Sequence, residues 1–295
     1  MRATNRPSLG GDPASPRSSP TVRRPGRFAA ARLGFLLGAL GAVATAASAD
    51  PAAARAMVTD RPSKTDGPFT LDAGRGQLET EFFTVTHDAD AGGRTRALSL
   101  GSVFLRWGVT PQFELQLGWQ SYARVTTTDA AGARTRAAGF GDTVVRAKYN
   151  FWGNDGGATA FSLLPFAKIP TNRGGLGNDA VEGGLSLPFI VNLPAGWQLG
   201  LMAKWSRLLA SRGHGRENFW EYSVIGGRAL TEKLSCYSEA WVGRSAEPGV
   251  AAQRSLGLGL GYALNDRWCL DAGVNLALNR ATADTAFFCG TSVRF

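Results

Sequence analysis

Phe113-Glu114-Leu115-Gln116-Leu117-Gly118-Trp119-Gln120 alternates strictly between large apolar residues and polar or small ones. Successive side chains of a β-strand point to opposite faces of the sheet, so the apolar residues of this stretch share one face. The same alternation returns in 181–193, 256–264 and 270–278. No segment after residue 49 follows the 3.6-residue period of a helix, so the sequence predicts an all-β fold.

Turn-forming residues divide the chain into twelve predicted strands, at 77–87, 95–109, 112–126, 139–152, 158–170, 180–193, 197–209, 217–230, 233–244, 254–264, 267–279 and 285–295. Tight turns at one end alternate with longer polar loops at the other. This pattern predicts a transmembrane antiparallel up-and-down β-barrel of about 12 strands, with short periplasmic turns, longer extracellular loops and both termini in the periplasm. The alternation is weakest in 139–152 and 217–230, so the number of strands could differ from twelve by two.

The charged residues of these strands indicate which face meets lipid. They lie on the face opposite the Leu, Val, Phe and Trp residues: Glu79, Glu81, Arg106, Glu114, Asp142, Arg146, Lys148, Lys168, Glu182, Lys204, Glu239 and Asp271. The core of a soluble β-sandwich, the main alternative, would bury these ions at several kcal/mol for each unpaired charge. A water-filled lumen lined by them avoids that cost. Aromatic residues near the strand ends suit interfacial girdles, although ordinary strand-end aromatics are an alternative.

The chain ends on a short alternating strand, Cys289-Gly290-Thr291-Ser292-Val293-Arg294-Phe295. A final strand with one apolar face and no residue after it suits the closing strand of a barrel, which must pair with 77–87. A terminal phenylalanine on such a strand resembles the assembly signal of bacterial outer-membrane barrels. Phe295 is therefore predicted to contact the barrel assembly machinery, and the barrel wall to contact outer-membrane lipid.

Residues 1–49 have the features of a cleaved secretory signal peptide with an extended basic N-region. Arg23, Arg24, Arg27 and Arg32 precede an apolar run over 33–47 and the small residues 47–49, with cleavage expected before Asp50. A membrane anchor, the alternative, needs ~20 strongly apolar residues. The whole chain carries +9, but seven Arg and one Asp lie in 1–49, which leaves +3 for residues 50–295. Nucleic acid is therefore not an expected partner.

Catalytic and metal-binding groups are sparse after the signal. His87 and His214 are the two histidines, and only His87 has serines close in sequence, Ser99 and Ser102. The wide spacing of Cys236, Cys269 and Cys289 suits neither a metal site nor a disulfide framework, and their number is odd. We therefore predict no enzyme activity, no metal and no cofactor. A lipid hydrolase using His87 is the enzymatic alternative.

A leader over 50–76 precedes the barrel of 77–295 and carries the one specific motif. Thr59, Asp60, Arg61, Pro62, Thr65 and Pro68, followed by Gly74, Gln77, Leu78 and Glu79, resemble the opening of the outer-membrane β-barrel transporter family of meta-pathway phenol degradation proteins. Ser63, Lys64 and Gly67 depart from its pattern. Gly139-Phe140-Gly141-Asp142 and Arg146-Ala147-Lys148-Tyr149 are similar to its fourth strand. The resemblance implies a transporter and leaves the solute open.

Asp60-Arg61-Pro62 is predicted to form a charged turn inside or across the periplasmic mouth, where it pairs with lumen charges. A solvated leader with no such role is the alternative. The function we expect is passive passage of small, hydrophobic or aromatic solutes through a charged lumen. A structural or surface-interaction barrel without transport is the competing function, and the oligomeric state is left open.

Overall fold

The computed structural model describes residues 55–90, 92–172, 174–177, 179–210 and 215–295, so the predicted signal peptide lies outside the described residues. Its strands are β1 (Gly76–Asp90), β2 (Gly93–Thr110), β3 (Phe113–Asp129), β4 (Arg134–Gly139), β5 (Thr143–Trp152), β6 (Thr159–Ile169), β7 (Glu182–Asn192), β8 (Trp197–Leu209), β9 (Arg216–Ala229), β10 (Leu234–Ser245), β11 (Gln253–Asn265), β12 (Trp268–Ala277) and β13 (Thr285–Arg294). A 3₁₀ turn, η2, covers Pro194–Gly196. None of the helical structure in the described ranges is long and apolar enough to span a membrane.

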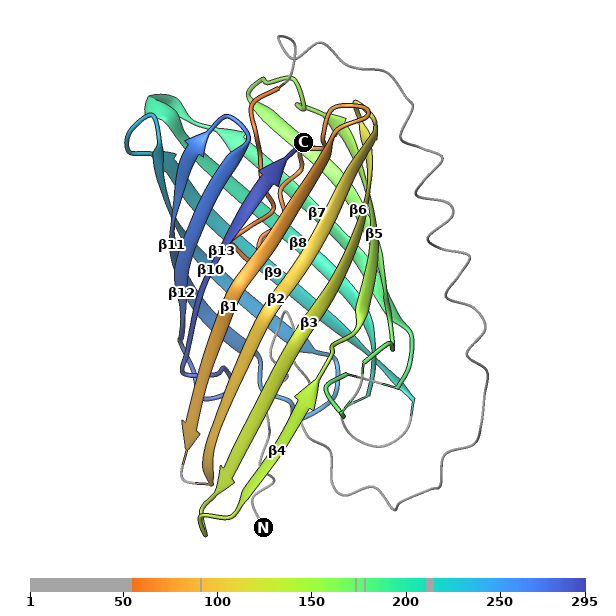
Figure 1. Cartoon of the computed structure of the whole chain (residues 1–295), viewed down its shortest axis with the longest axis vertical. Coiled ribbons are helices and arrows are strands. Elements are labelled where there is room, and N and C mark those ends of the chain that lie inside the picture. Colours follow the sequence, from red (N-terminus) through yellow and green to blue (C-terminus); the bar gives the residue numbers. More distant parts are fainter. Residues whose placement is uncertain (1–54, 91, 173, 178, 211–214) are drawn as a thin grey trace.

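The strands form one antiparallel sheet that closes on itself (Figure 1). Each strand from β5 to β13 pairs with the next along the chain, β13 pairs with β1, and β2 joins β1 to β3. β3 then pairs with β5, which completes a ring of twelve strands. β4 is an extra strand that pairs with the outer part of β3. The predicted twelve-stranded barrel is confirmed, with one strand added.

The first two long loops differ from the prediction. β1 and β2 stay paired as far as Asp90 and Gly93, so most of the loop expected over 88–94 is strand. The expected loop over 127–138 contains the end of β3 and most of β4, and the strand expected from residue 139 begins at Thr143. These extensions carry polar residues on their outer face. They therefore lack the apolar alternation by which the sequence reveals a lipid-facing strand.

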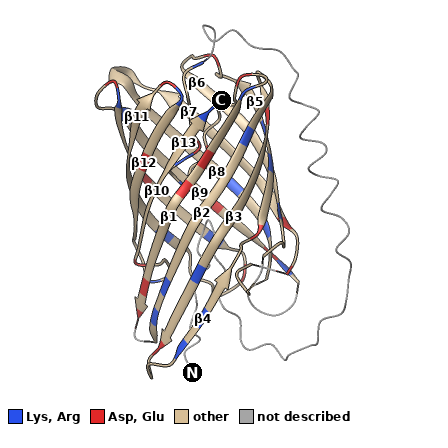
Figure 2. Ribbon diagram, in the orientation of Figure 1, with Lys and Arg blue, Asp and Glu red and all other residues tan. Residues whose placement is uncertain are grey.

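The outer wall of the barrel is apolar and the inner wall is polar. The outward side chains include many exposed large apolar and aromatic residues, among them Trp119, Tyr149, Phe151, Trp152, Trp197, Trp205, Trp220 and Trp268. The buried set is dominated by polar and charged residues, the reverse of a soluble core. Figure 2 shows charges of both signs along the strands. An apolar outer wall and a polar inner wall are typical of a barrel that spans a membrane.

The chain end closes the barrel where it was predicted to. β13 pairs with β1 from Gln77 opposite Arg294 to His87 opposite Thr285. Gly76 and Phe295 then exchange two backbone hydrogen bonds of 2.9 and 2.8 Å. The Phe295 ring lies over Gly76, where any larger residue would collide with it, and stays 58% exposed. The free edge of the last strand is therefore fully paired.

Candidate functional site

The leader before β1 lies inside the barrel, in the half that contains the chain's C-terminus (Figure 1). Its residues Thr65, Pro68, Thr70 and Leu71 are buried, although they belong to no strand. They are buried against polar inward side chains, so each leader backbone group needs a hydrogen-bond partner from the wall. The wall supplies these partners from both sides of the lumen.

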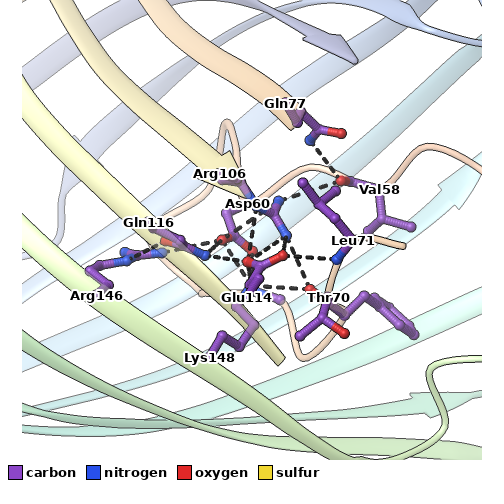
Figure 3. Close-up of polar contacts among 12 residues, drawn as sticks. Val58, Asp60, Thr70, Leu71, Gln77, Arg106, Glu114, Gln116, Arg146 and Lys148 are labelled. Atoms are coloured by element: carbon purple, nitrogen blue, oxygen red, sulfur yellow. Dashed lines mark hydrogen bonds and ion pairs between the residues drawn. The ribbon is translucent and has the colours of Figure 1, made fainter. Parts of the chain in front are cut away.

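Asp60 is the centre of the contacts on one side of the lumen (Figure 3). Its carboxylate accepts hydrogen bonds from Lys148 Nζ at 2.7 and 2.9 Å and from Arg146 Nη2 at 3.2 Å, both on β5. Gln116 Nε2 on β3 donates at 3.1 Å, and Arg106 Nη1 lies 3.7 Å away. Three positive side chains of two strands therefore converge on a single carboxylate of the leader.

Arg106 and its carboxylates form the buried base of this cluster. Its guanidinium lies 2.7 Å from Glu79 Oε1 and 2.9 Å from Glu114 Oε1, and the side chains of all three are 2% exposed or less. Glu79 also accepts from the backbone N–H groups of Asp60 and Arg61, and Glu114 accepts from that of Leu71 at 2.8 Å. The wall carboxylates thus neutralise Arg106 and hold the leader backbone at once, which satisfies ions that would be costly to bury alone.

Arg61 anchors the leader to the adjoining stretch of wall, from β12 to β1. Its Nε and Nη2 donate to the two oxygens of Asp271 on β12 at 3.1 and 2.7 Å, and its Nη1 lies 3.4 Å from Glu81 on β1. Between these strands, Gly290 of β13 leaves space for the guanidinium, because a Cβ there would overlap it. This is the planar, bidentate pairing that arginine forms with carboxylates.

Lys64 and Thr65 reach β10. The backbone N–H groups of both residues donate to Glu239, at 3.1 and 2.7 Å, and the Thr65 hydroxyl lies 2.6 Å from that of Ser223 on β9. Lys64 Nζ lies 4.1 Å from the ring centroid of Trp241. The leader therefore contacts the wall from β1 around to β12, and occupies the lumen rather than one side of it.

A second group of ion pairs lies on the wall from β5 to β9. Lys168 Nζ on β6 is 2.7 Å from Glu182 on β7, and Lys204 Nζ on β8 is 3.0 Å from Glu221 on β9. Asp142, just before β5, is 3.8 Å from Lys168 Nζ. The lumen wall thus carries both signs of charge along its length, in neighbouring pairs.

The loop between β6 and β7 also turns inward. Leu176 is 2% exposed and packs with Ala97, Ala123 and Val125 of β2 and β3, next to Ala137 of β4. This small apolar cluster lies on the inner face of the strands that extend beyond the rest of the barrel. Leu176 therefore covers the inner face of these strands.

The electrostatics of Asp60 follow from its neighbours. Burial alone would raise the pKa of Asp60, but the positive charges of Arg106, Lys148 and Arg146 outweigh it and hold the pKa below the ordinary value of 3.8. For Arg61, burial opposes the charge, and the bond to Asp271 more than compensates, so the pKa of Arg61 is raised. Both leader residues are therefore charged across the range in which bacteria grow.

The residues predicted to line the lumen are all on the inner side. Asp60, Arg61, Glu79, Glu81, Arg106, Glu114, Arg146, Lys148, Glu239 and Asp271 meet around the leader, while Asp142, Lys168, Glu182 and Lys204 lie in the second group. The sequence reasoning missed Lys64, Thr65 and Asp66 of the leader, and Glu221. Glu221 lies between the outward Trp220 and Tyr222 in the sequence and pairs with Lys204 across the strands. That alternation is the signal that would have found it.

The pairing of His87 with Ser99, one form of the hydrolase alternative, finds no geometric support. His87 is exposed on the outer face of β1, whereas Ser99 is 5% exposed on the inner face of β2, so the wall separates the two side chains. Within the described ranges, no group of three or more His, Cys, Asp or Glu side chains could hold a metal ion. The three cysteines are free.

Comparison with known proteins places this geometry in a family. The family model for the MetA-pathway of phenol degradation matches residues 59–295. The chain belongs to this family. The match begins within the Asp60 segment that lies in the lumen and runs to Phe295, so leader and barrel are a single family unit. Comparison with curated proteins gave no match.

Solved structures share the fold at low sequence identity. The COG4313 outer membrane channel from Pseudomonas putida F1 aligns with a TM-score of 0.59 and 14% identity, over 80% of this chain and 99% of that one. The NanC porin aligns with a TM-score of 0.50 and 7% identity, over 74% of this chain and 98% of that one. At these identities the likeness concerns the architecture of the barrel.

Proposed function

We propose that this protein is an outer-membrane channel for the passive passage of small solutes. The observation that carries the proposal is the inner wall, where side chains of both signs face a lumen that the chain's own leader occupies. Twelve strands lie between barrels of eight, which side chains fill, and barrels of 16–18, which hold an open aqueous channel. A lumen of this size is suited to small solutes, and its mixed charges argue against a strict ion filter.

The solute class we propose is small hydrophobic or aromatic molecules. Three aromatic rings face the lumen beneath cations: Trp241 under Lys64, Phe104 under Arg146 at 4.7 Å, and Phe166 under Lys204 at 5.3 Å. Trp241 is only 3% exposed, but Phe104 and Phe166 can stack against an aromatic solute while the neighbouring cations attract its hydroxyl or carboxylate. The family description names phenol degradation, which agrees with this class without naming the solute.

The leader is proposed to control passage. Its contacts with β1, β2, β3, β5, β9, β10 and β12 fill the periplasmic half of the lumen, so a solute must pass beside it or displace part of it. Because the charges are paired across the leader, one broken pair would loosen it locally. Asp60 and Arg61 are the residues on which this control depends most.

We also propose the cellular location and the partners of the chain. Export would use the signal peptide of residues 1–49, cleaved before Asp50, and the barrel would then enter the outer membrane through the assembly machinery with Phe295 as its signal. Outer-membrane lipid is the partner of the apolar wall. No nucleic acid, metal or cofactor is required, and no catalytic step is proposed.

Single-channel recording of the refolded full chain tests the proposal directly. We expect small, discrete conductance steps, and cells that lack the protein should take up a panel of small solutes, simple phenols among them, more slowly than wild-type cells. Unchanged phenol uptake would remove the aromatic class alone. The other function considered is a structural barrel without transport, and silence under every solute would favour it.

A further inference from the structure

The outer face of the β2–β4 extension carries five arginines, here called the rim arginines: Arg94, Arg96, Arg124, Arg134 and Arg136. Pairing registers place them on one face. Arg96 lies opposite Thr126, which lies opposite Arg136, and Arg94 and Arg134 both lie opposite Thr128. The inner face of the same strands carries the small apolar cluster under Leu176, so the two faces differ completely.

The rim arginines have no acidic partners. The lumen cations Arg61, Arg106, Arg146, Lys148, Lys168 and Lys204 each lie within 4 Å of a carboxylate. Within the described ranges the rim arginines make no ion pair and no side-chain hydrogen bond. Asp88, on the neighbouring β1, lines the same hollow and forms no ion pair with any of them. Like charges gathered on one sheet face repel one another unless an anion binds there.

A hollow lies among these side chains. Its volume is about 520 Å³, and it is lined by Arg94, Arg96, Arg124 and Arg134 together with His87, Asp88, Ala89, Thr95, Thr126 and Thr128. Guanidinium groups and threonine hydroxyls are all hydrogen-bond donors that fit the oxygens of a phosphate. The combination of a concave shape and converging donors is that of an anion site.

The height of the hollow on the barrel identifies the anion's source. Below it on β2, the outward residues from Leu98 to Val109 are apolar, and both Leu100 and Val109 are exposed. At ~3.3 Å per residue and a tilt of about 45°, this run spans roughly 26 Å, close to the height of a barrel's apolar band. Arg96 and Arg94 follow directly above, at the level of the lipid headgroups. They lie at the end opposite the C-terminus, which faces the cell exterior in an outer-membrane barrel.

We propose that the rim arginines bind the phosphates of the lipid A headgroup of lipopolysaccharide in the outer leaflet. Arginine pairs with phosphate bidentately, and basic clusters at headgroup height recognise anionic lipids. The acyl chains of a lipid held there would lie against the apolar band below Leu98. The proposal rests on the outer-membrane location but not on transport, because a barrel that conducts nothing could bind the lipid equally well.

Native mass spectrometry of the full-length protein in detergent tests this proposal, with purified bisphosphorylated lipid A as the probe. The variant is R96Q/R124Q, two neighbours of the hollow. The control is R228Q/R267Q, which removes the same charge at the opposite rim. We expect the wild type and the control to retain lipid A alike, and R96Q/R124Q to retain at least 10-fold less. Heat-modifiable migration on gels shows that each variant is folded.

Two further measurements on the wild-type protein distinguish binding of the lipid from binding of free phosphate. The wild-type protein should bind dephosphorylated lipid A at least 10-fold more weakly than the bisphosphorylated form. Inorganic phosphate at equal concentration should not displace the lipid. Equal retention by the wild type and R96Q/R124Q, indifference to dephosphorylation, or displacement by phosphate would each overturn the proposal. Channel conductance is not a readout here, so a failure of transport would be seen separately.

Discussion

The Arg61 guanidinium and the Asp271 carboxylate are joined by two N–H···O bonds, of 3.1 and 2.7 Å, across 210 residues of sequence. One belongs to the leader and the other to β12, so this pair fixes where the leader crosses the lumen. Glu81 lies on its other side at 3.4 Å. A contact of this kind can hold a plug firmly and yet be released as a unit, since both partners would regain water when it opens.

Removing the guanidinium should release the leader. Arg61→Ala deletes two charge-assisted bonds and leaves Asp271 and Glu81 without their cation, which we expect to cost about 2 kcal/mol, or roughly 30-fold in the ratio of docked to released leader. Planar-bilayer recordings should show longer and larger openings. Arg228→Gln, an outward arginine at the periplasmic rim, is the control and should leave the record unchanged. Identical records for Arg61→Ala and wild type would contradict the anchoring role.

Asp60 should set the ion preference of the lumen. Asp60→Asn leaves Lys148 and Arg146 facing a neutral amide, so the lumen gains one positive charge and should favour anions. Lys148→Met should shift the preference the other way. The reversal potential in a salt gradient measures both. Shifts of equal sign, or none, would show that ions do not pass by this cluster.

The docking of the leader should resist acid. The pKa of Asp60 is held below 3.8 in the folded protein, so its contribution to stability is complete above that value and is lost as the pH falls further. Conductance should therefore stay constant from neutral pH to about pH 4 and rise only below it. In Lys148→Met, where one of the charges that lower the pKa is absent, the rise should begin at a higher pH. A wild-type transition well above pH 4 would show that another group controls the leader.

Phe295 should be needed for assembly rather than for stability of the finished barrel. Its backbone completes the pairing of β13 with β1, while its ring remains 58% exposed. Phe295→Ala keeps the backbone bonds and removes the ring. We expect several-fold less heat-modifiable protein in the outer membrane, with export across the inner membrane unchanged. Phe287→Ala removes another exposed ring of the same strand, at 51%, and should assemble normally.

The strands of the barrel could be predicted from the sequence, but the path of the leader through the lumen could not. Lipid on one side and polar groups on the other impose the period-two pattern, so the wall strands could be located within a few residues. The extended ends of β3 and β4 are polar on their outer face, and Thr128 and Arg136 therefore looked like loop residues. The path of the leader depends on contacts such as that of Thr65 with Glu239, 174 residues apart, which no local pattern records.

Locking the leader to the wall tests whether it must move. The hydroxyl oxygens of Thr65 and Ser223 lie 2.6 Å apart, close to the ~2.05 Å of an S–S bond. In a background with Cys236, Cys269 and Cys289 replaced by Ser, Thr65→Cys with Ser223→Cys should form a disulfide on oxidation. If passage requires displacement of the leader, oxidation should stop conductance and a reductant should restore it.

The matched control for the lock is Thr95→Cys with Thr127→Cys, whose hydroxyls lie 3.3 Å apart on β2 and β3 and do not touch the leader. Oxidation of this pair should leave conductance unchanged, because these strands already pair in the wall. If the Thr65–Ser223 lock also left conductance unchanged, solutes would pass beside a fixed leader. The mixed charges around Asp60 would then line the route itself, and the leader would act as a fixed constriction rather than a gate.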